Sequence, residues 1–459
     1  MYQIDFHKPL SIHFIGIGGI SMSGLAEILL EEGFTISGSD SKKSPLTSLL
    51  ESKGAKIYYG QRASNISDSV QVVVYTAAIH PDNPEFACAK EKGIPMLTRA
   101  QLLGQIMRNY DTPIAVSGTH GKTTTTSMIS QILLEADADP TISVGGILPS
   151  IGGNIRVGQS ETFVTEACEY TNSFLSFFPK ISVILNIDAD HLDFFKDIDD
   201  IRHSFRLFAE KIPKGGLLVI NSGIENINEI ISGLPCRIVT FGKDLSSMYT
   251  AQNITYDEFA RPSYDLVVQG EIINRITLGV TGEHNVYNSL AAIAVAMELG
   301  IGFDAIMAGL KKFRGTDRRF EKKGEIGGVT IIDDYAHHPQ EIAATLSAAK
   351  NYPHKKLWCV FQPHTYSRTK LLLDRFAKAL CLADNIVLAD IYAAREVDTL
   401  GISSKTLQAE IEKLGKKCYY FPSFEEIEKF LCENCINGDL LITMGAGDIV
   451  KVGEKLLGI

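Results

Sequence analysis

Runs of apolar, largely β-branched residues recur along this chain, and stretches with helical periodicity separate them. Such runs cover residues 11–15, 113–118, 181–187 and 357–363. A strand that is apolar at successive positions is typical of a parallel sheet covered by helices on both faces, because both sides of the strand are then buried. The alternation therefore predicts an α/β fold with doubly wound parallel sheets.

Three groups of these strands and helices follow one another. With 459 residues the chain is too long for one hydrophobic core and has the length of three ordinary domains. We predict domains over residues 1–109, 110–314 and 315–459. No short-period repeat or low-complexity tract interrupts this organisation.

Charge and composition exclude several classes of protein. The formal net charge is −10 and is spread along the chain, so no broad positive surface is available for nucleic acid or an anionic membrane. The eight cysteines are scattered, the first residues lack the pattern of a secretion signal, and no window of about 18 apolar residues exists. We therefore expect a cytoplasmic protein without nucleic-acid or membrane partners.

A glycine-rich loop with one lysine joins the first strand of the central domain to a helix. The loop reads Gly118-Thr119-His120-Gly121-Lys122-Thr123 and is shorter than the commonest phosphate-binding pattern. Its backbone N–H groups and the helix N-terminus suit a phosphate chain, with Lys122 on the β- and γ-phosphates and Thr123 near Mg²⁺. The loop predicts a central sheet of the P-loop ATPase type. The alternative is an ordinary strand-to-helix turn with a solvated lysine.

Acidic residues and a histidine follow two further strands of the central domain. Glu166 stands at the end of one strand, and Asp188, Asp190 and His191 lie just beyond the next. Ligands of open parallel sheets bind outside these strand ends, so the side chains are expected to converge on the phosphate loop. Oxygen ligands with one nitrogen suit Mg²⁺, although each residue alone could be structural.

The first domain also opens with a glycine-rich turn. Residues 16–21 resemble a dinucleotide-binding fingerprint whose third glycine is replaced by Ser21, and Asp40 ends the next strand in the position of a sugar contact. This pattern predicts a Rossmann-like domain that binds a diphosphate. NAD and a UDP-sugar both remain open.

Polar motifs mark the end of the central domain and the third domain. Asn285 and Asn288 begin a helix, where they suit either an adenine edge or helix capping. The motifs DRRF (317–320), DDYAHHP (333–339) and FQPHTYSRT (361–369) place Asp, Arg and His at domain starts or strand ends, in binding or structural roles. His337 and His338 are expected to point apart, and Pro339 fits the first turn of a helix.

Six motifs occur together in the order and approximate spacing of a known family. They are HFIGIGGISMSGLAEIL, GTHGKTTTT, ILNIDADHLDFF, HNVYNSLAA, DDYAHHP and FQPHTYSRT. Over its whole length the chain resembles the Mur ligase family, and within it the members that add the first amino acid in peptidoglycan synthesis. The resemblance implies a UDP-sugar domain, a central ATPase-like domain and a Rossmann-like C-terminal domain that binds the amino acid and helps to enclose ATP.

The resemblance also implies the reaction. An ATP-dependent ligase would join L-alanine to the carboxylate of UDP-N-acetylmuramate through an acyl phosphate, releasing ADP and phosphate, with Mg²⁺ as cofactor. The step belongs to cell wall biogenesis and so to cell shape and division. The expected partners are UDP-N-acetylmuramate, L-alanine and ATP, and the expected state is a monomer or weak homodimer.

Particular residues receive roles from the resemblance. UDP-sugar contacts are expected from Gly18, Gly19, Asp40, Thr76, Ala77 and Ala78. ATP contacts are expected from Gly118, Thr119, His120, Gly121, Lys122, Thr123, Thr124, Asn285, Asn288, Arg319 and Asp334. Mg²⁺ is expected on Thr123, Glu166 and His191, and L-alanine on His338, His364 and Arg368. The expected catalytic residues are Lys122, Glu166, His191 and His364, the last as the base for the alanine amine.

Three positions depart from the commonest pattern of the family. Ser21 replaces a glycine, Cys168 stands where many members have Asp, and Thr365 where some have Arg, which would leave Arg368 alone to hold the alanine carboxylate. Arg206 occupies the region where related ligases carry a carbamylated lysine, so no carbamate is expected.

Three rival functions explain parts of the pattern. A ligase that adds a whole peptide would share the same motifs. A nicotinamide-dependent dehydrogenase would use the first glycine loop but leaves the second unexplained. A nucleotide switch would hydrolyse ATP slowly without a carboxylate substrate, and the chain lacks the Asn-Lys-x-Asp reader of guanine.

Overall fold

A computed structural model of the chain describes residues 2–76, 78–192, 194–394 and 396–459. Two units divide the chain, the first comprising Met1–Met248 with Ala291–Gly309 and the second Tyr249–Leu290 with Leu310–Ile459. The boundaries expected near residues 109 and 314 stay a prediction. In the described part of the chain, no helix has the length and apolar character needed to cross a membrane.

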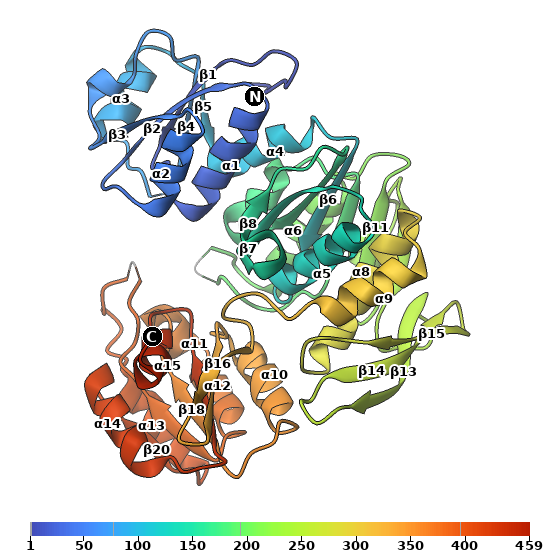
Figure 1. Ribbon diagram of the computed structural model, residues 1–459, viewed down its shortest axis with the longest axis vertical. Coiled ribbons are helices and arrows are strands. Elements are labelled where there is room, and N and C mark those ends of the chain that lie inside the picture. The colour runs from blue at the N-terminus through green and yellow to red at the C-terminus, as the bar shows by residue number, and fades with distance from the viewer. Residues whose placement is uncertain (1, 77, 193, 395) are drawn as a thin grey trace. The chain divides into compact units, whose positions relative to one another are not determined.

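The first unit begins with the predicted β-α-β arrangement, drawn in blue in Figure 1. Its parallel sheet has the order β3-β2-β1-β4-β5. The strands are β1 (Ser11–Ile15), β2 (Thr35–Asp40), β3 (Lys56–Tyr59), β4 (Val72–Tyr75) and β5 (Met96–Thr98), and the helices are α1 (Ile20–Glu31), α2 (Pro45–Ser52), α3 (Pro84–Glu91) and α4 (Arg99–Met107), with a 3-10 turn η1 at Ala63–Asn65. Because the chain leaves β1 toward β2 and later returns to β4, the glycine loop after β1 lies at a switch point of the sheet.

A second sheet in this unit carries the phosphate loop. Within the unit its order is β12-β11-β10-β6-β9-β7-β8, parallel except for β8. The strands are β6 (Thr112–Ser117), β7 (Thr141–Leu148), β8 (Gly153–Arg156), β9 (Thr162–Ala167), β10 (Ile181–Ile184), β11 (Leu217–Asn221) and β12 (Arg237–Phe241), and the helices are α5 (Lys122–Glu135), α6 (Ile198–Ala209) and α7 (Ile227–Ile231), with 3-10 turns η2 (Pro149–Ile151) and η3 (Tyr170–Ser176). β6 lies between β9 and β10, so the ends of all three strands meet at one edge.

The second unit begins with an antiparallel meander that the sequence did not reveal. Its strands are β13 (Tyr249–Tyr256), β14 (Pro262–Val268) and β15 (Glu271–Thr277). Exposed residues such as Ile272 and Ile273 obscure the alternation of buried and exposed positions that marks a strand. Two helices predicted near residues 285–315 follow, α8 (His284–Glu298) and α9 (Phe303–Lys312), and the two units divide them.

The third sheet confirms the expected doubly wound arrangement. Its order is β16-β17-β21-β18-β19-β20, parallel except for the β16/β17 hairpin at one edge. The strands are β16 (Glu321–Ile326), β17 (Val329–Asp334), β18 (Leu357–Phe361), β19 (Asn385–Leu388), β20 (Cys418–Tyr420) and β21 (Leu440–Met444), and the helices are α10 (Pro339–Ala349), α11 (Tyr366–Leu371), α12 (Leu373–Leu380), α13 (Ser404–Lys413), α14 (Phe424–Asn434) and α15 (Val450–Leu457). One core contains side chains of α10, α12 and α13, and another contains those of α14 and α15, so apolar layers cover both faces.

Candidate active site

The phosphate loop follows β6 as the sequence predicts. Gly118 and Gly121 adopt φ of 138° and 85°, which favours glycine, and Gly121 begins α5. A Cβ on Gly118 would lie 2.9 Å from the Cβ of Leu185, just beyond β10. The side chain of Asn186 accepts from the backbone N–H of His120 at 2.8 Å and donates to its carbonyl at 3.0 Å. The end of β10 therefore holds the loop in shape.

Lys122 reaches back across its own loop. Its ammonium donates to the carbonyls of Gly118 at 2.5 Å and Thr119 at 3.0 Å, and to Glu169 Oε2 at 3.0 Å. Burial alone would lower the pKa of Lys122, but the charges of Glu169, Cys168 and Glu166 and the hydrogen bond to Glu169 together raise that pKa above its usual value. The loop therefore contains an ammonium whose charged form its neighbours favour.

Glu169 is the functional candidate that sequence reasoning missed. Its side chain is only 2 % exposed, and its carboxylate lies 3.8 Å from His191 Nε2 as well as beside Lys122. The residue lies two positions beyond β9, in the same TEACEY segment that drew attention to Glu166. A signal was thus present, because a second carboxylate also follows that strand end.

Glu166 lies beside the phosphate loop, as predicted. Its carboxylate accepts from the Thr123 hydroxyl at 3.1 Å and from the backbone N–H of Gly145 at 2.5 Å. A Cβ on Gly145 would approach the carboxylate to 2.9 Å, so a larger residue there would displace it. The hydroxyl and carboxylate together form an oxygen-rich cradle at the first turn of α5.

His191 lies beside the Glu169 carboxylate, with Nε2 at 3.8 Å from it. Its backbone has a left-handed φ of 53°, and its ring stacks on Tyr170 with centroids 4.5 Å apart. Across the described residues, no group of three or more His, Cys, Asp or Glu side chains forms a ready metal site. Mg²⁺ commonly takes one or two protein ligands and completes its shell with phosphate and water, so the oxygens of Thr123 and Glu166 still fit it.

The N-terminal glycine loop depends on the end of β2. The carbonyl of Ser39 accepts from the N–H groups of Gly16 and Ile17, and Asp40 Oδ2 accepts from Gly18 N at 2.8 Å. A Cβ on Gly18 would lie 2.8 Å from that oxygen. Asp40, expected at a sugar hydroxyl, therefore uses one carboxylate oxygen to hold the loop.

The other predicted contacts of this loop are placed only in part. The backbone N–H of Ala78 donates to the Thr76 hydroxyl at 3.2 Å, in the turn after β4, and Gly19 precedes α1. Ala77 lies outside the described residues. Ser21, the departure from the glycine pattern, accepts from Arg99 Nη1 at 3.0 Å, so the missing glycine is replaced by a polar contact with α4.

The predicted adenine-side residues form a chain of hydrogen bonds in the second unit. Asn288 Nδ2 donates to Asn285 Oδ1 at 2.9 Å, and Asn285 Nδ2 donates to the carbonyl of Thr281 at 2.7 Å. Both side chains thus help to order the start of α8. Adenine recognition by these residues stays a prediction.

Asp334 holds the turn after β17. Its carboxylate accepts from the N–H groups of Phe320 and Ala336, each at 2.8 Å. Burial raises its pKa to about 6, although the charge of Arg319 opposes that increase. The guanidinium of Arg319 lies 5.3 Å from the ring centroid of Tyr335.

Of the three residues predicted to contact alanine, His364 and Arg368 lie together and His338 lies apart from them. Arg368 Nη1 donates to His364 Nδ1 at 3.1 Å, and the ring of His337 lies 5.7 Å from that of His364. His338, expected at the amino acid, is instead fully buried at the N-cap of α10. A contact of His338 with the amino acid stays a prediction, and its neighbour His337 is the histidine whose ring lies beside His364. Pro339 begins α10 as expected.

Arg206, named in place of a carbamylated lysine, has structural contacts. Its guanidinium donates to Glu210 at 2.8 Å and to the carbonyls of Ile230, at 2.9 Å, and Ser232, at 2.5 Å. These groups belong to α6 and to the end of α7. The side chain therefore links two helices.

Family models match all three regions of the chain. Models described as Mur ligase family, catalytic domain, Mur ligase middle domain, and Mur ligase, glutamate ligase domain match residues 11–111, 116–296 and 318–447. Proteins named UDP-N-acetylmuramate--L-alanine ligase from Lachnospira eligens and Agathobacter rectalis are each 64% identical, with 100% of both chains covered.

A solved structure agrees with these sequence matches. The UDP-N-acetylmuramate-alanine ligase of Thermotoga maritima has a TM-score of 0.80 at 31% identity and covers 98% of each chain. A murein peptide ligase of Psychrobacter arcticus has a TM-score of 0.69 at 25% identity, again with 98% of each chain covered. With three family models and relatives of this identity over its full length, the chain belongs to the Mur ligase family.

Proposed function

We propose that the chain is an ATP-dependent ligase that joins the amine of L-alanine to the carboxylate of UDP-N-acetylmuramate. The names of its full-length relatives support this substrate pair. The observation that carries the proposal is the gathering of Lys122, Glu169 and the Thr123–Glu166 pair around a phosphate loop. We further propose that it acts in the cytoplasm as a monomer or weak homodimer.

Activation of the carboxylate explains the need for ATP. An amine cannot displace oxide from a carboxylate at neutral pH. When a carboxylate oxygen bonds to the γ-phosphorus, the bond from that phosphorus to ADP breaks and an acyl phosphate forms. The amine then attacks the carbonyl carbon, phosphate leaves, and the amine loses a proton, so the products are the amide, ADP and phosphate.

Charge neutralisation is the main task of the phosphate loop in the first step. The nucleophile and the triphosphate are both anionic, so catalysis depends on fixed positive groups and on alignment. Lys122 supplies the positive charge, and Glu169 keeps it protonated and directed into the loop. Glu169 therefore acts as a positioning residue.

The oxygen cradle is the proposed place of Mg²⁺. The Thr123 hydroxyl and the Glu166 carboxylate would hold the ion, with His191 at the edge of the cluster. Bound Mg²⁺ supplies further neutralisation of the phosphate oxygens. Glu166 in turn is oriented by the backbone N–H of Gly145.

We propose that the His364–Arg368 cluster binds the alanine. Arg368 offers a guanidinium to the alanine carboxylate, which suits a planar carboxylate. Because Arg368 donates to His364 Nδ1, a neutral His364 carries its proton on Nε2 and acts as a donor. We therefore assign His364 to binding rather than to the base role expected from the sequence.

An omission assay tests the proposed function. Phosphate release and the amide product are measured with ATP, Mg²⁺, UDP-N-acetylmuramate and L-alanine, and each component is then left out in turn. We expect the amide by mass spectrometry only in the complete mixture. Amide formation with an alanyl tripeptide but not with alanine would favour the rival peptide ligase instead.

A further inference from the structure

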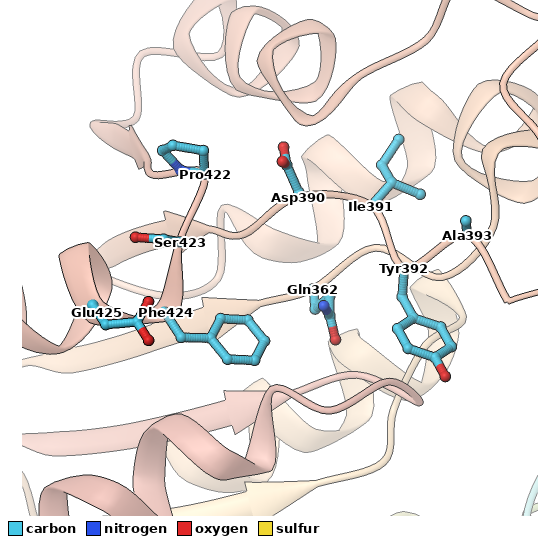
Figure 2. Close-up of a pocket in the computed structure, with 9 residues that line it drawn as sticks. All are labelled: Gln362, Asp390, Ile391, Tyr392, Ala393, Pro422, Ser423, Phe424 and Glu425. Atoms are coloured by element: carbon cyan, nitrogen blue, oxygen red, sulfur yellow. The ribbon is translucent and has the colours of Figure 1, made fainter.

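A pocket lies at the carboxyl ends of three strands in the third sheet. Its volume is about 360 Å³, which lies within the range of small-molecule sites. Its walls come from the segments after β18, β19 and β20, and Figure 2 shows Tyr392 at one end of it and Phe424 with Glu425 at the other. The proposed function does not use this space.

Tyr392 lies between this pocket and the proposed alanine site. Its ring lines the pocket and also stacks on His364, with centroids 5.6 Å apart and planes inclined by 19°. His364 bonds to Arg368, the proposed carboxylate clamp. One aromatic ring therefore contacts both spaces.

The backbone of Tyr392 is held firmly in this position. Its N–H donates to the carbonyl of Pro363 at 2.8 Å, and its carbonyl accepts from Thr365 N at 2.9 Å. A Cβ on Gly447, in the loop after β21, would lie 2.9 Å from the Tyr392 ring at Cγ, so the glycine leaves room for the ring. These contacts fix the backbone of Tyr392, and its ring, which is 39 % exposed, forms one wall of the pocket.

The space behind the ring has two carboxylates on its walls, both exposed, and one of them, Glu425, lies 4.0 Å from Lys455 Nζ. Asp390 and Glu425 line it, and Asp390 accepts from the Tyr420 hydroxyl at 2.6 Å. Phe424 and Pro422 add apolar surface. A short hydrocarbon chain that ends in an ammonium group matches this combination of surfaces.

We propose that Tyr392 restricts the acceptor to a small amino acid, and that the pocket behind it accepts a longer, cation-ended side chain when the ring is removed. The inference rests on the proposed function, because it places the amino acid at His364 and Arg368. Alanine needs no space beyond the ring, whereas the side chain of L-ornithine would enter the pocket and approach Glu425.

Acceptor preference tests the proposal with the full-length enzyme. The amide products of L-alanine, L-ornithine and L-norleucine, the neutral counterpart of ornithine in length, are quantified for the wild type, Tyr392→Ala and Tyr392→Phe. In Tyr392→Ala we expect the ornithine-to-alanine ratio of kcat/KM to rise about tenfold or more, as for other pocket enlargements. Tyr392→Phe keeps the ring and is expected to keep the wild-type ratio.

The charge of the pocket is tested by a second substitution. Adding Glu425→Gln to Tyr392→Ala is expected to bring ornithine down to the level of norleucine. Tyr392→Val serves as a second enlargement, and thermal unfolding shows which variants are folded. The inference is overturned if Tyr392→Ala or Tyr392→Val is folded and still makes the alanine product but keeps the wild-type ornithine-to-alanine ratio of kcat/KM. It is also overturned if norleucine gains as much as ornithine. Failure of the wild type to make that product would refute the proposed function instead.

Discussion

Lys122 is the residue whose charge the proposed mechanism needs most. Its ammonium is fixed inside the phosphate loop by two carbonyls and Glu169. For Lys122→Ala we expect kcat to fall by roughly two to three orders of magnitude, as for other preorganised charge stabilisers. Steady-state phosphate release measures the effect, and Lys243→Ala, which changes an exposed lysine, is the control. Near-normal turnover in Lys122→Ala would remove the assignment.

Glu169 is predicted to act through Lys122. In Glu169→Gln the pKa of Lys122 falls, because burial is then opposed by less negative charge. We expect kcat to fall by about 10- to 100-fold, the range seen for residues that orient a functional group. The pH dependence of kcat should also shift at its alkaline limb. Glu161→Gln is the control, because it changes an exposed carboxylate directly before β9. An unchanged pH profile of kcat in Glu169→Gln would show that Glu169 is only structural.

The start of α8 and the end of β17 each contain a group whose protonation changes the stability of the fold, with opposite signs. Desolvation by the surrounding protein, with the charge of Arg319, lowers the pKa of His284 to about 4 from 6.5, so protonation favours the unfolded chain. Burial raises the pKa of Asp334 to about 6 from 3.8, so protonation favours the folded chain. Between about pH 4 and pH 6, a rise in pH therefore stabilises the fold through His284 and destabilises it through Asp334.

Urea unfolding at several pH values separates the two contributions. Relative to His284→Gln, the wild type is expected to lose stability as the pH falls from 6.5 to 4. Relative to Asp334→Asn, the wild type is expected to lose stability as the pH rises from 3.8 to 6. Parallel stability curves for the wild type and either variant would contradict the corresponding assignment.

The contact between α4 and η3 depends on a glycine. A Cβ on Gly104 would overlap the carbonyl oxygen of Ser176 and lie 2.9 Å from its carbon. For Gly104→Ala we expect a loss of roughly 1–3 kcal/mol of unfolding free energy, since overpacking outweighs the ~1 kcal/mol gain in helix propensity. Gly153→Ala is the matched control, because the nearest atom to its Cβ would lie at 3.9 Å. Equal stability of the two variants in urea would show that the helix can move aside.

At the scale of the whole molecule, the residues expected to bind ATP belong to both units. Lys122 lies in the first, and Asn285 and Arg319 lie in the second. We expect the X-ray scattering profile of the chain to change when a non-hydrolysable ATP analogue and UDP-N-acetylmuramate are added together. Lys122→Ala should show a smaller change at the same concentrations. Identical wild-type profiles with and without the ligands would contradict this expectation.

Local patterns in the sequence were sufficient for the main features of the fold. Buried strands, glycine loops and helix starts are specified by residues that are neighbours in the chain, which is why β6, the loop at Gly118–Gly121 and α5 follow the prediction. The antiparallel strands β13, β14 and β15 escaped it, because exposed apolar residues and short spacing weaken the alternation.

Tertiary structure alone decided which side chains meet. Sheet order brings Glu169 to Lys122, turn geometry buries His338 and leaves His337 beside His364, and the parallel bridge between His364 and Tyr392 places a ring between two spaces. The sequence by itself determined the elements and the chemical groups that each one carries. Their contacts depend on the register and order of strands distant in the chain, and no local pattern encodes these distances.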